Sequence, residues 1–353
     1  MRVLSLLSGA DLGGAEIHVE HIVKSVPAQH LVVVLADGPM VERYTDAGAD
    51  IEILPTPGKI PLQSVPELER IVARFEPDIL HSHQTKATLL AAMLATPCRR
   101  IITIHGSHRQ FAMTSSVPAA WYKWADMWSA RKAEAVIAVC EADRRELIAS
   151  GFSAQRTVTI PNGVPDPGFV DPPDHDGAVE ILWAGRFSPE KSPGTMLDIA
   201  RMVHSHPNLL RIRMIGDGPC RPALVGATIP KFLLEPPVKS LREALASAAI
   251  VLNTSVSEGA SLVLLEALAA GRAIVATSAG GNPEVIGGAG LIVPVELPDA
   301  DRAAHFASAV KRYLEDPVFR AETGLRARAR YRERFRLETM ADALLKLYGM
   351  RKG

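Results

Sequence analysis

Two carboxylates in one short segment have the residue types and spacing most suggestive of chemistry. Glu258 stands in a loop after an apolar stretch, and Glu266 lies further on, inside a helical pattern. At 1.5 Å of rise per residue, Glu266 is about 7.5 Å along that helix. Gly259 lets a ligand approach the backbone, and Ser261 can cap the helix. The pattern predicts two carboxylates at different depths of one crevice; the alternative is a helix-dipole carboxylate and a buried ion pair.

Two cations form a second candidate site. Arg186 and Lys191 follow a predicted strand at 181–184 and lead into the start of a helix. The planar fork of arginine can grip a phosphate, and lysine adds a point charge. The segment therefore predicts a phosphate site at the carboxyl edge of a sheet. A salt bridge to Glu190 or to another nearby acid is the alternative.

Glycine-rich loops follow two further predicted strands. Gly13 and Gly14 open a helix after the first strand, where backbone N–H groups can approach an anion. This loop fits neither GxGxxG nor GxxxxGK[ST], so NAD and P-loop chemistry lack support. The loop at 277–284 also carries paired glycines and can line the crevice of the two glutamates. A plain turn is the alternative for both loops.

Four histidines, His81, His83, His105 and His108, stand at strand ends in the first half of the chain. An HxH pattern suggests a metal, but no third acidic or cysteine ligand is obvious nearby, so we predict no metal site. His105 follows a predicted strand directly, which favours an imidazole aimed into a cleft between domains. A satisfied core or surface histidine is the alternative for each.

Strands and helices alternate along the chain, and this alternation must position those residues. Continuous apolar strands separated by helices predict parallel sheets covered on both faces. The predicted strands are 3–7, 31–35, 79–81, 101–104, 135–139, 181–184, 210–215, 250–253, 273–277 and 290–293. The predicted helices are 15–25, 66–75, 85–95, 118–133, 141–150, 194–204, 240–248, 261–270, 300–314 and a tail from 321 to 348.

A proline- and aspartate-rich stretch at 165–177 interrupts this alternation and has the composition of a linker. It predicts an N-terminal domain over 1–167 and a C-terminal domain over 168–330. The chain has 353 residues, which suggests two domains at roughly 150 residues each.

The composition excludes several classes of protein. Hydrophobic residues make up 47% and charged residues 22%, which excludes a disordered chain, a collagen and a coiled coil. The formal net charge is zero, which disfavours a nucleic-acid partner. Three cysteines without a CxxC pattern favour a reducing compartment. No apolar run is long enough to span a membrane, so we expect a cytoplasmic protein.

Three tryptophans, Trp121, Trp124 and Trp128, share one predicted helix with Lys123, Arg131 and Lys132. Such a helix could lie in a membrane interface, on the inner face of the plasma membrane. A core face is the alternative.

Together these signals resemble the retaining glycosyltransferases of family 4, which have the GT-B architecture of two Rossmann-like, doubly wound parallel-sheet domains facing across a cleft. The matching motifs run in the family's order over nearly the whole chain. They are Gly13-Gly14-Ala15-Glu16, His105-Gly106, residues 160–164, Gly185-Arg186 with Lys191, Gly216-Asp217-Gly218-Pro219, Glu258 with Glu266, and Gly280-Gly281 with Glu284.

The resemblance implies a nucleotide-diphosphate sugar as donor, a glycan or lipid-linked acceptor, and no cofactor or metal. It implies that Arg186 and Lys191 hold the diphosphate, that Glu266 binds the ribose, and that Glu258 contacts the transferred sugar near His105. It places a C-terminal helix at about 331–353 back on the first domain. The implied donor site comprises Gly13, Gly14, Gly185, Arg186, Lys191, Gly216, Glu258, Gly259, Ala260, Ser261, Leu262 and Glu266; His105, Glu258, Arg186 and Lys191 are the implied catalytic residues.

The implied reaction is transfer with retention, in cell-surface polysaccharide or lipopolysaccharide synthesis. Two cations and helix N-termini can stabilise the leaving diphosphate without a metal. The segment 220–239 is shorter than in the family and commonly borders the base, so the nucleotide stays open. A nucleotide-sugar epimerase and a non-catalytic partner subunit of the same architecture are the alternatives.

Overall fold

The computed structural model describes residues 1–58, 61–106, 119–168 and 177–349. His108 and most of the predicted linker lie outside these ranges. The chain forms two compact units: unit 1 comprises Met1–Gly163 and Leu337–Gly353, and unit 2 comprises Val164–Arg336. The boundary between the two units lies between Gly163 and Val164. The sequence pattern had placed this boundary four residues later, after residue 167.

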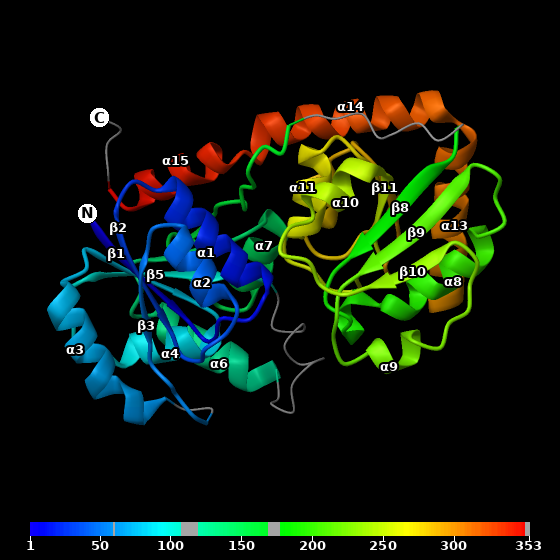
Figure 1. The fold of residues 1–353 in the computed structure, drawn as a ribbon. Coiled ribbons are helices and arrows are strands. Elements are labelled where there is room, and N and C mark those ends of the chain that lie inside the picture. Colours follow the sequence, from blue (N-terminus) through cyan, green and yellow to red (C-terminus); the bar gives the residue numbers. More distant parts are fainter. Residues whose placement is uncertain (59–60, 107–118, 169–176, 350–353) are drawn as a thin grey trace. The chain divides into compact units, whose positions relative to one another are not determined.

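Unit 1 is built on a seven-stranded parallel sheet (Figure 1). Its strand order, β3-β2-β1-β4-β5-β6-β7, reverses direction between β1 and β4, as in doubly wound folds. The strands are β1 (Arg2–Leu7), β2 (Gln29–Val34), β3 (Asp50–Ile53), β4 (Ile79–His83), β5 (Arg99–Ile104), β6 (Ala135–Ala138) and β7 (Thr157–Thr159).

Helices cover the sheet of unit 1 and bury its apolar strands. They are α1 (Gly14–Ser25), α2 (Met40–Asp46), α3 (Val65–Phe75), α4 (Thr85–Met93), α6 (Ala119–Ala130), α7 (Glu141–Ala149) and α15 (Leu337–Leu347). The last of these comes from the C-terminal end of the chain. Its Met340, Ala341 and Leu344 pack in one core cluster with Val3 and Ile22.

Unit 2 repeats the doubly wound plan with six parallel strands in the order β10-β9-β8-β11-β12-β13. The reversal here lies between β8 and β11. The strands are β8 (Val179–Ala184), β9 (Leu209–Ile215), β10 (Phe232–Glu235), β11 (Ala248–Asn253), β12 (Ala273–Thr277) and β13 (Leu291–Val293).

Two hydrophobic clusters in unit 2 lie on opposite faces of its sheet (Figure 1). One joins the sheet to α8 (Pro193–Val203) and α13 (Asp299–Glu315), and the other joins it to α10 (Arg242–Ser247), α11 (Leu262–Ala269), α12 (Asn282–Ile286) and α14 (Pro317–Arg334). The short α9 (Arg221–Leu224) packs with the first. Apolar side chains on both faces explain why these strands read as continuous apolar runs.

The predicted α/β class with two doubly wound, parallel-sheet domains is confirmed. The strands β3, β7 and β10 and the helices α2, α9 and α12 were not predicted, because each is only a few residues long and carries too little periodicity. The tail predicted as one helical stretch is two helices. It breaks at Phe335 and Arg336, where the chain passes from unit 2 to unit 1.

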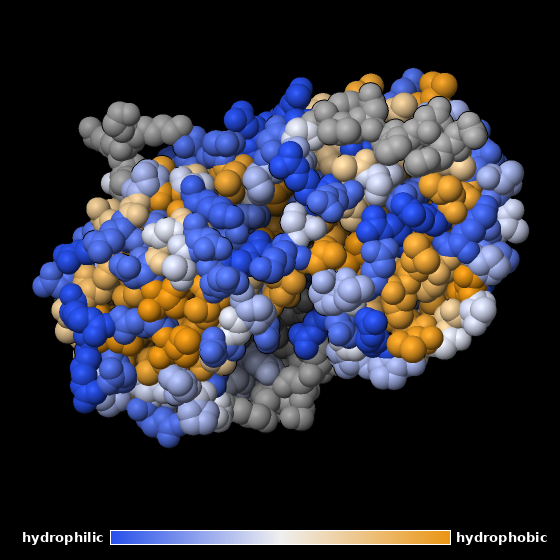
Figure 2. Space-filling view, viewed as in Figure 1, coloured by the Kyte–Doolittle hydropathy of each residue, from blue (hydrophilic) through white to orange (hydrophobic). Residues whose placement is uncertain are grey.

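Polar and charged residues cover much of the visible surface, and apolar residues form separate patches (Figure 2). One patch lies over β10 and α9 in unit 2, where Leu233 and Val225 are among the exposed apolar side chains. Within the described ranges, no helix combines the length and apolarity needed to cross a membrane.

Candidate active site

The loops after β8 and β11 meet at the reversal point of the unit 2 sheet. Ligands of open α/β sheets bind at the carboxyl ends of strands beside such a point. Thr254, directly after β11, accepts a hydrogen bond from the Trp183 indole at 2.9 Å and donates to the Lys191 carbonyl at 2.9 Å. The Val256 amide donates to the Glu190 carbonyl at 2.8 Å. These bonds hold the two loops together.

The predicted cation Lys191 and the predicted carboxylate Glu258 form an ion pair across these loops. Lys191 Nζ lies 2.6 Å from Glu258 Oε1, and the two side chains are 21% and 6% exposed. The alternative to a phosphate site was a salt bridge between Lys191 and a nearby acid. Lys191 does form a salt bridge, but its partner, Glu258, is itself a predicted site residue. Glu190 instead accepts a hydrogen bond from the Ser188 hydroxyl at 2.6 Å.

Polar residues at the end of β11 position Glu258. Its Oε1 also accepts hydrogen bonds from Ser255 Oγ at 2.7 Å and from Asn253 Nδ2 at 3.2 Å. Asn253 Nδ2 also donates to Ser261 Oγ at 3.1 Å, and its Oδ1 accepts from Asn282 Nδ2 at 3.3 Å. Asn253, Ser255 and Asn282 were not predicted as site residues. The signal that could have found them is the run of polar residues directly after a buried strand.

Glycines allow the loops around this pair to pack backbone against backbone. Gly280 has φ of +49°, and a Cβ there would overlap the Glu258 carbonyl oxygen. The next amide, of Gly281, donates to the Gly259 carbonyl at 2.9 Å. The loop after β12 therefore lies against the Glu258 loop, as its glycines predicted. Gly216 has φ of +151° and a similar close contact with the Gly185 carbonyl, which joins the loops after β9 and β8.

The helix that carries Glu266, α11, is apolar on the sides that face the core. Leu264, Leu265 and Leu268 are buried, while Glu266 is half-buried. Ser261 occupies the N-cap position, but its side chain does not cap the helix; the Asn253 amide holds it instead. Arg186 lies in the loop after β8 and is exposed.

The reversal point of unit 1 lies between β1 and β4, and two loops meet there as well. Gly13 is the N-cap of α1, and Gly14 is its exposed first residue. Gln84, directly after β4, has φ of +67°, a strained value for a residue with a side chain. Its side chain accepts a hydrogen bond from the Ser8 amide at 2.9 Å and donates to Glu16 Oε1 at 2.7 Å.

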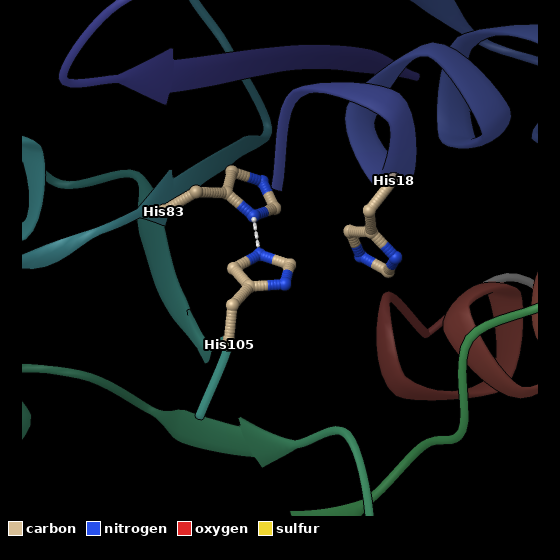
Figure 3. Close-up of side chains that lie close together, drawn as sticks. All are labelled: His18, His83 and His105. Carbon is tan, nitrogen blue, oxygen red and sulfur yellow. Dashed lines mark hydrogen bonds between the residues drawn. The ribbon is translucent and has the colours of Figure 1, made fainter. Parts of the chain in front are cut away.

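Three histidines gather at this edge of the unit 1 sheet (Figure 3). His83 ends β4, His105 follows β5, and His18 comes from α1. His83 Nδ1 and His105 Nε2 share a hydrogen bond at 3.1 Å. His81 is a satisfied core histidine instead, since its ring nitrogens bond the Tyr348 hydroxyl and Thr103 Oγ1, both at 2.7 Å.

Burial keeps these imidazoles uncharged. Desolvation, with a smaller contribution from a neighbouring histidine in each case, lowers the pKa of His105 and of His81 to about 3. The pKa values of His18 and His83 are also well below the usual range, chiefly through desolvation. At neutral pH each ring therefore offers a lone pair on one nitrogen and a proton on the other.

Comparison with known proteins agrees with this architecture. The sequence model described as Glycosyltransferase Family 4 matches residues 12–166, and the one described as Glycosyl transferases group 1 matches residues 178–316. Each covers most of one doubly wound unit, and the second includes the reversal point between β8 and β11. The chain belongs to the family 4, group 1 glycosyltransferases.

Several relatives of this glycosyltransferase share its sequence at a distance. It is 28% identical to a phosphatidyl-myo-inositol mannosyltransferase of Mycobacterium tuberculosis, covering 95% of this chain and 93% of the relative. It is 26% identical to a sulfoquinovosyl transferase of Arabidopsis thaliana over 65% of this chain; the matched part spans 48% of that relative.

Solved structures show the same fold. HepE of Anabaena, in complex with UDP-glucose, aligns with a TM-score of 0.82 at 20% identity, covering 99% of both chains. Sucrose-phosphate synthase of Thermosynechococcus elongatus aligns with a TM-score of 0.77 at 17% identity, covering 99% of this chain and 98% of that one. The glycosyltransferase therefore has the predicted GT-B fold.

The structure brings several predicted site residues together within each unit. In unit 2, Lys191 and Glu258 are in contact, and the loop that carries Gly259 contacts Gly281. Arg186 and Glu266 lie on the elements that follow β8 and β11. In unit 1, His105 contacts His83, and Gly13 and Gly14 lie at the start of the helix that carries His18.

Proposed function

We propose that the protein transfers a sugar, with retention and without a metal, from a nucleotide-diphosphate donor to a glycan or lipid-linked acceptor. The observation that carries this proposal is the Lys191–Glu258 ion pair at the reversal point of unit 2, where the sheet geometry favours a ligand. The UDP-glucose complex of the similarly folded HepE supports a nucleotide sugar as donor.

The donor's diphosphate is assigned to the two cations after β8. Lys191 uses one N–H on Glu258 and has two further N–H groups for phosphate oxygens. Arg186 is exposed and keeps its five donors for a bidentate contact. Negative charge develops on the leaving diphosphate as the sugar–phosphate bond breaks, and cations fixed beside it lower the barrier. This charge balance is why the proposal requires no divalent metal.

The carboxylates are assigned to the sugar and the ribose. Glu258 directs Oε1 to Lys191, Ser255 and Asn253, which leaves Oε2 for a hydroxyl of the transferred sugar. Glu266 is half-buried further along the same strand–helix unit and is assigned to the ribose hydroxyls. Gly13, Gly14 and His105 of unit 1 are assigned to the phosphates and to the anomeric region.

Retention follows if the acceptor attacks the face from which the diphosphate leaves. The acceptor oxygen then forms its bond to the anomeric carbon as the carbon–oxygen bond to phosphate breaks. The departing phosphate oxygen takes the acceptor proton. No enzyme nucleophile is needed, and the charges balance.

A membrane-associated acceptor is the favoured class. Trp124 on α6 is 57% exposed, while Ala125, Asp126 and Ser129 are its buried residues. Lys132 Nζ lies 4.4 Å from the ring centre of Trp128. Trp124 stacks on Trp128 with 6.5 Å between ring centres, so an exposed indole and a lysine lie at either side of the half-buried Trp128, an arrangement that suits an anionic lipid surface. Two of the relatives, a phosphatidyl-myo-inositol mannosyltransferase and a sulfoquinovosyl transferase, have names consistent with glycolipid synthesis.

A screen of nucleotide sugars by thermal shift tests the donor assignment. A ligand at 100 times its dissociation constant stabilises the protein by about 2.7 kcal/mol. The stabilising donor is then incubated alone and with glycolipid acceptors, and NMR of the product reports the anomeric configuration. An epimer formed from donor alone would favour the epimerase, an inverted product would refute retention, and no donor binding would favour a partner subunit.

Sedimentation with anionic vesicles tests the membrane contact. We expect the wild type to sediment and a Trp121→Ser, Trp124→Ser, Trp128→Ser variant to stay in the supernatant. If the wild type stays in the supernatant, the membrane contact is refuted and the three tryptophans serve only to pack the helix.

A further inference from the structure

The three histidines at the reversal point of unit 1 have a geometry that sugar transfer does not require. His18, His83 and His105 each offer a ring nitrogen, and these nitrogens all lie within 4.8 Å of one another (Figure 3). We propose that they form a binding site for one transition-metal ion of the zinc class. The proposed transfer chemistry needs no metal, although it shares one residue with this site, His105.

The spacing of the nitrogens is close to that of a metal site. Zinc binds imidazole nitrogen at about 2.0–2.1 Å in a tetrahedron, which places neighbouring nitrogens about 3.4 Å apart. His83 Nδ1 and His105 Nε2 are already 3.1 Å apart. Their shared hydrogen bond directs the two nitrogens toward each other. A metal ion takes the place of the shared proton when the donor ring carries its proton on its other nitrogen instead, so that both rings bind as neutral ligands.

The third ligand, His18, is free to complete the set. It is buried, and neither of its ring nitrogens has hydrogen-bond geometry to another group in the described ranges. Asn162 lies beside it and raises its pKa, the smallest of the influences on that ring. Its nitrogen lies within 4.8 Å of the other two, so a shift of at most about 1.4 Å brings it to metal-site spacing. That shift costs the ring at most its weak interaction with the Asn162 side chain.

Rigid elements hold the three backbones in place. His83 and His105 come from the neighbouring parallel strands β4 and β5, where His83 pairs with Thr103 in register. The Gln84 side chain connects the end of β4 to Glu16 on α1, two residues before His18. A site on paired strands and a tethered helix is better defined than a site on loops.

The ligand chemistry selects the kind of ion. Three neutral nitrogens suit Zn²⁺, Co²⁺, Ni²⁺ or Cu²⁺, whereas Mg²⁺ and Ca²⁺ require oxygen ligands. His83 Nε2 is buried and has no hydrogen-bond partner in the described part of the chain. Outer-shell partners are worth about 10–100-fold in metal affinity, so this site should bind more weakly than a structural zinc site. His105 is half-buried, which suits a fourth ligand from water.

Titration of the metal-free protein with Co²⁺ tests the proposal directly. We expect visible ligand-field absorption that saturates at one ion per chain and disappears when Zn²⁺ is added. His18→Ala should weaken Co²⁺ binding at least about 100-fold, because loss of even an outer-shell partner costs 10–100-fold. His105→Ala should weaken Co²⁺ binding to the same extent as His18→Ala. Mg²⁺ should neither bind nor compete.

The matched control is His305→Ala, since His305 is an exposed histidine in unit 2. It should bind Co²⁺ as the wild type does. Thermal melts in the absence of metal confirm that each variant is folded, and His18→Asn repeats the test if His18→Ala is not. Absence of the absorption in the wild type, or equal binding by His18→Ala and His305→Ala, would overturn the site. Neither sugar nor nucleotide enters this test, so its result is independent of the transferase assignment.

Discussion

Removing the Glu258 carboxylate should impair stability and turnover while leaving nucleotide affinity nearly intact. In Glu258→Ala, three donors lose one acceptor: Lys191 Nζ at 2.6 Å, Ser255 Oγ at 2.7 Å and Asn253 Nδ2 at 3.2 Å. Breaking a fully buried ion pair costs about 3–5 kcal/mol. Lys191 is 21% exposed, so water recovers part of this. We therefore expect the ligand-free protein to lose about 2–4 kcal/mol of unfolding free energy.

Nucleotide affinity should respond differently, because Lys191 keeps its charge and a bound diphosphate can replace the lost carboxylate as its partner. The dissociation constant of the free nucleotide diphosphate should change by less than about 10-fold, or 1.4 kcal/mol. Adding nucleotide should raise the melting temperature of Glu258→Ala more than that of the wild type. The turnover number should fall by about 10- to 150-fold, the equivalent of one charge-assisted hydrogen bond to the reacting sugar.

Glu258→Gln is the matched control, because its amide oxygen still accepts from Ser255 and Asn253. It should lose about 1–2 kcal/mol of stability, from the lysine contact alone, and should lose turnover as Glu258→Ala does. Denaturant unfolding, calorimetry and steady-state kinetics measure the three quantities. If Glu258→Ala kept wild-type stability, the ion pair would not hold Lys191. If it lost nucleotide affinity while Glu266→Ala lost only turnover, the assigned positions of the two carboxylates would be reversed.

Three further outcomes follow from the same geometry. Arg186→Ala and Lys191→Ala should each weaken binding of the free nucleotide diphosphate about 10- to 150-fold in calorimetry, since each removes charge-assisted hydrogen bonds worth about 1.5–3 kcal/mol; unchanged affinity in both would remove the phosphate assignment. Transferase activity should persist after EDTA treatment, and complete loss restored by Mg²⁺ or Mn²⁺ would contradict the metal-independent mechanism. Burial lowers the pKa of His81 and His105 to about 3 and that of His21 to about 4. These rings are neutral when folded and gain protons on unfolding, so their stabilising effect is complete above about pH 6.5 and is lost as the pH falls from there toward 3. Unfolding in urea at pH 7 and pH 5.5 should show a loss of about 1 kcal/mol for each such histidine, and equal stability at the two pH values would refute this.

The sequence by itself determined the fold class, because continuous apolar strands alternating with helices have few stable arrangements other than doubly wound sheets. It also identified Lys191 and Glu258 as candidate residues, since each lies in the segment between a recognisable strand and the next helix. The short strands and helices could not be predicted from the sequence. The strand β10, for example, is four residues long and half-exposed, so its pattern is not distinguishable from a loop.

Only the tertiary structure decided which residues touch. Lys191 and Glu258 follow different strands, β8 and β11, which become neighbours only when the chain crosses over and the sheet reverses. The same crossover in unit 1 brings His18 to His83 and His105. The HxH pattern comprised His81 and His83, and the ring of His81 is already satisfied. Local periodicity reflects burial and backbone hydrogen bonding within a few residues. Contacts between residues distant in sequence depend on strand order and register, and these are set by the packing of the whole sheet.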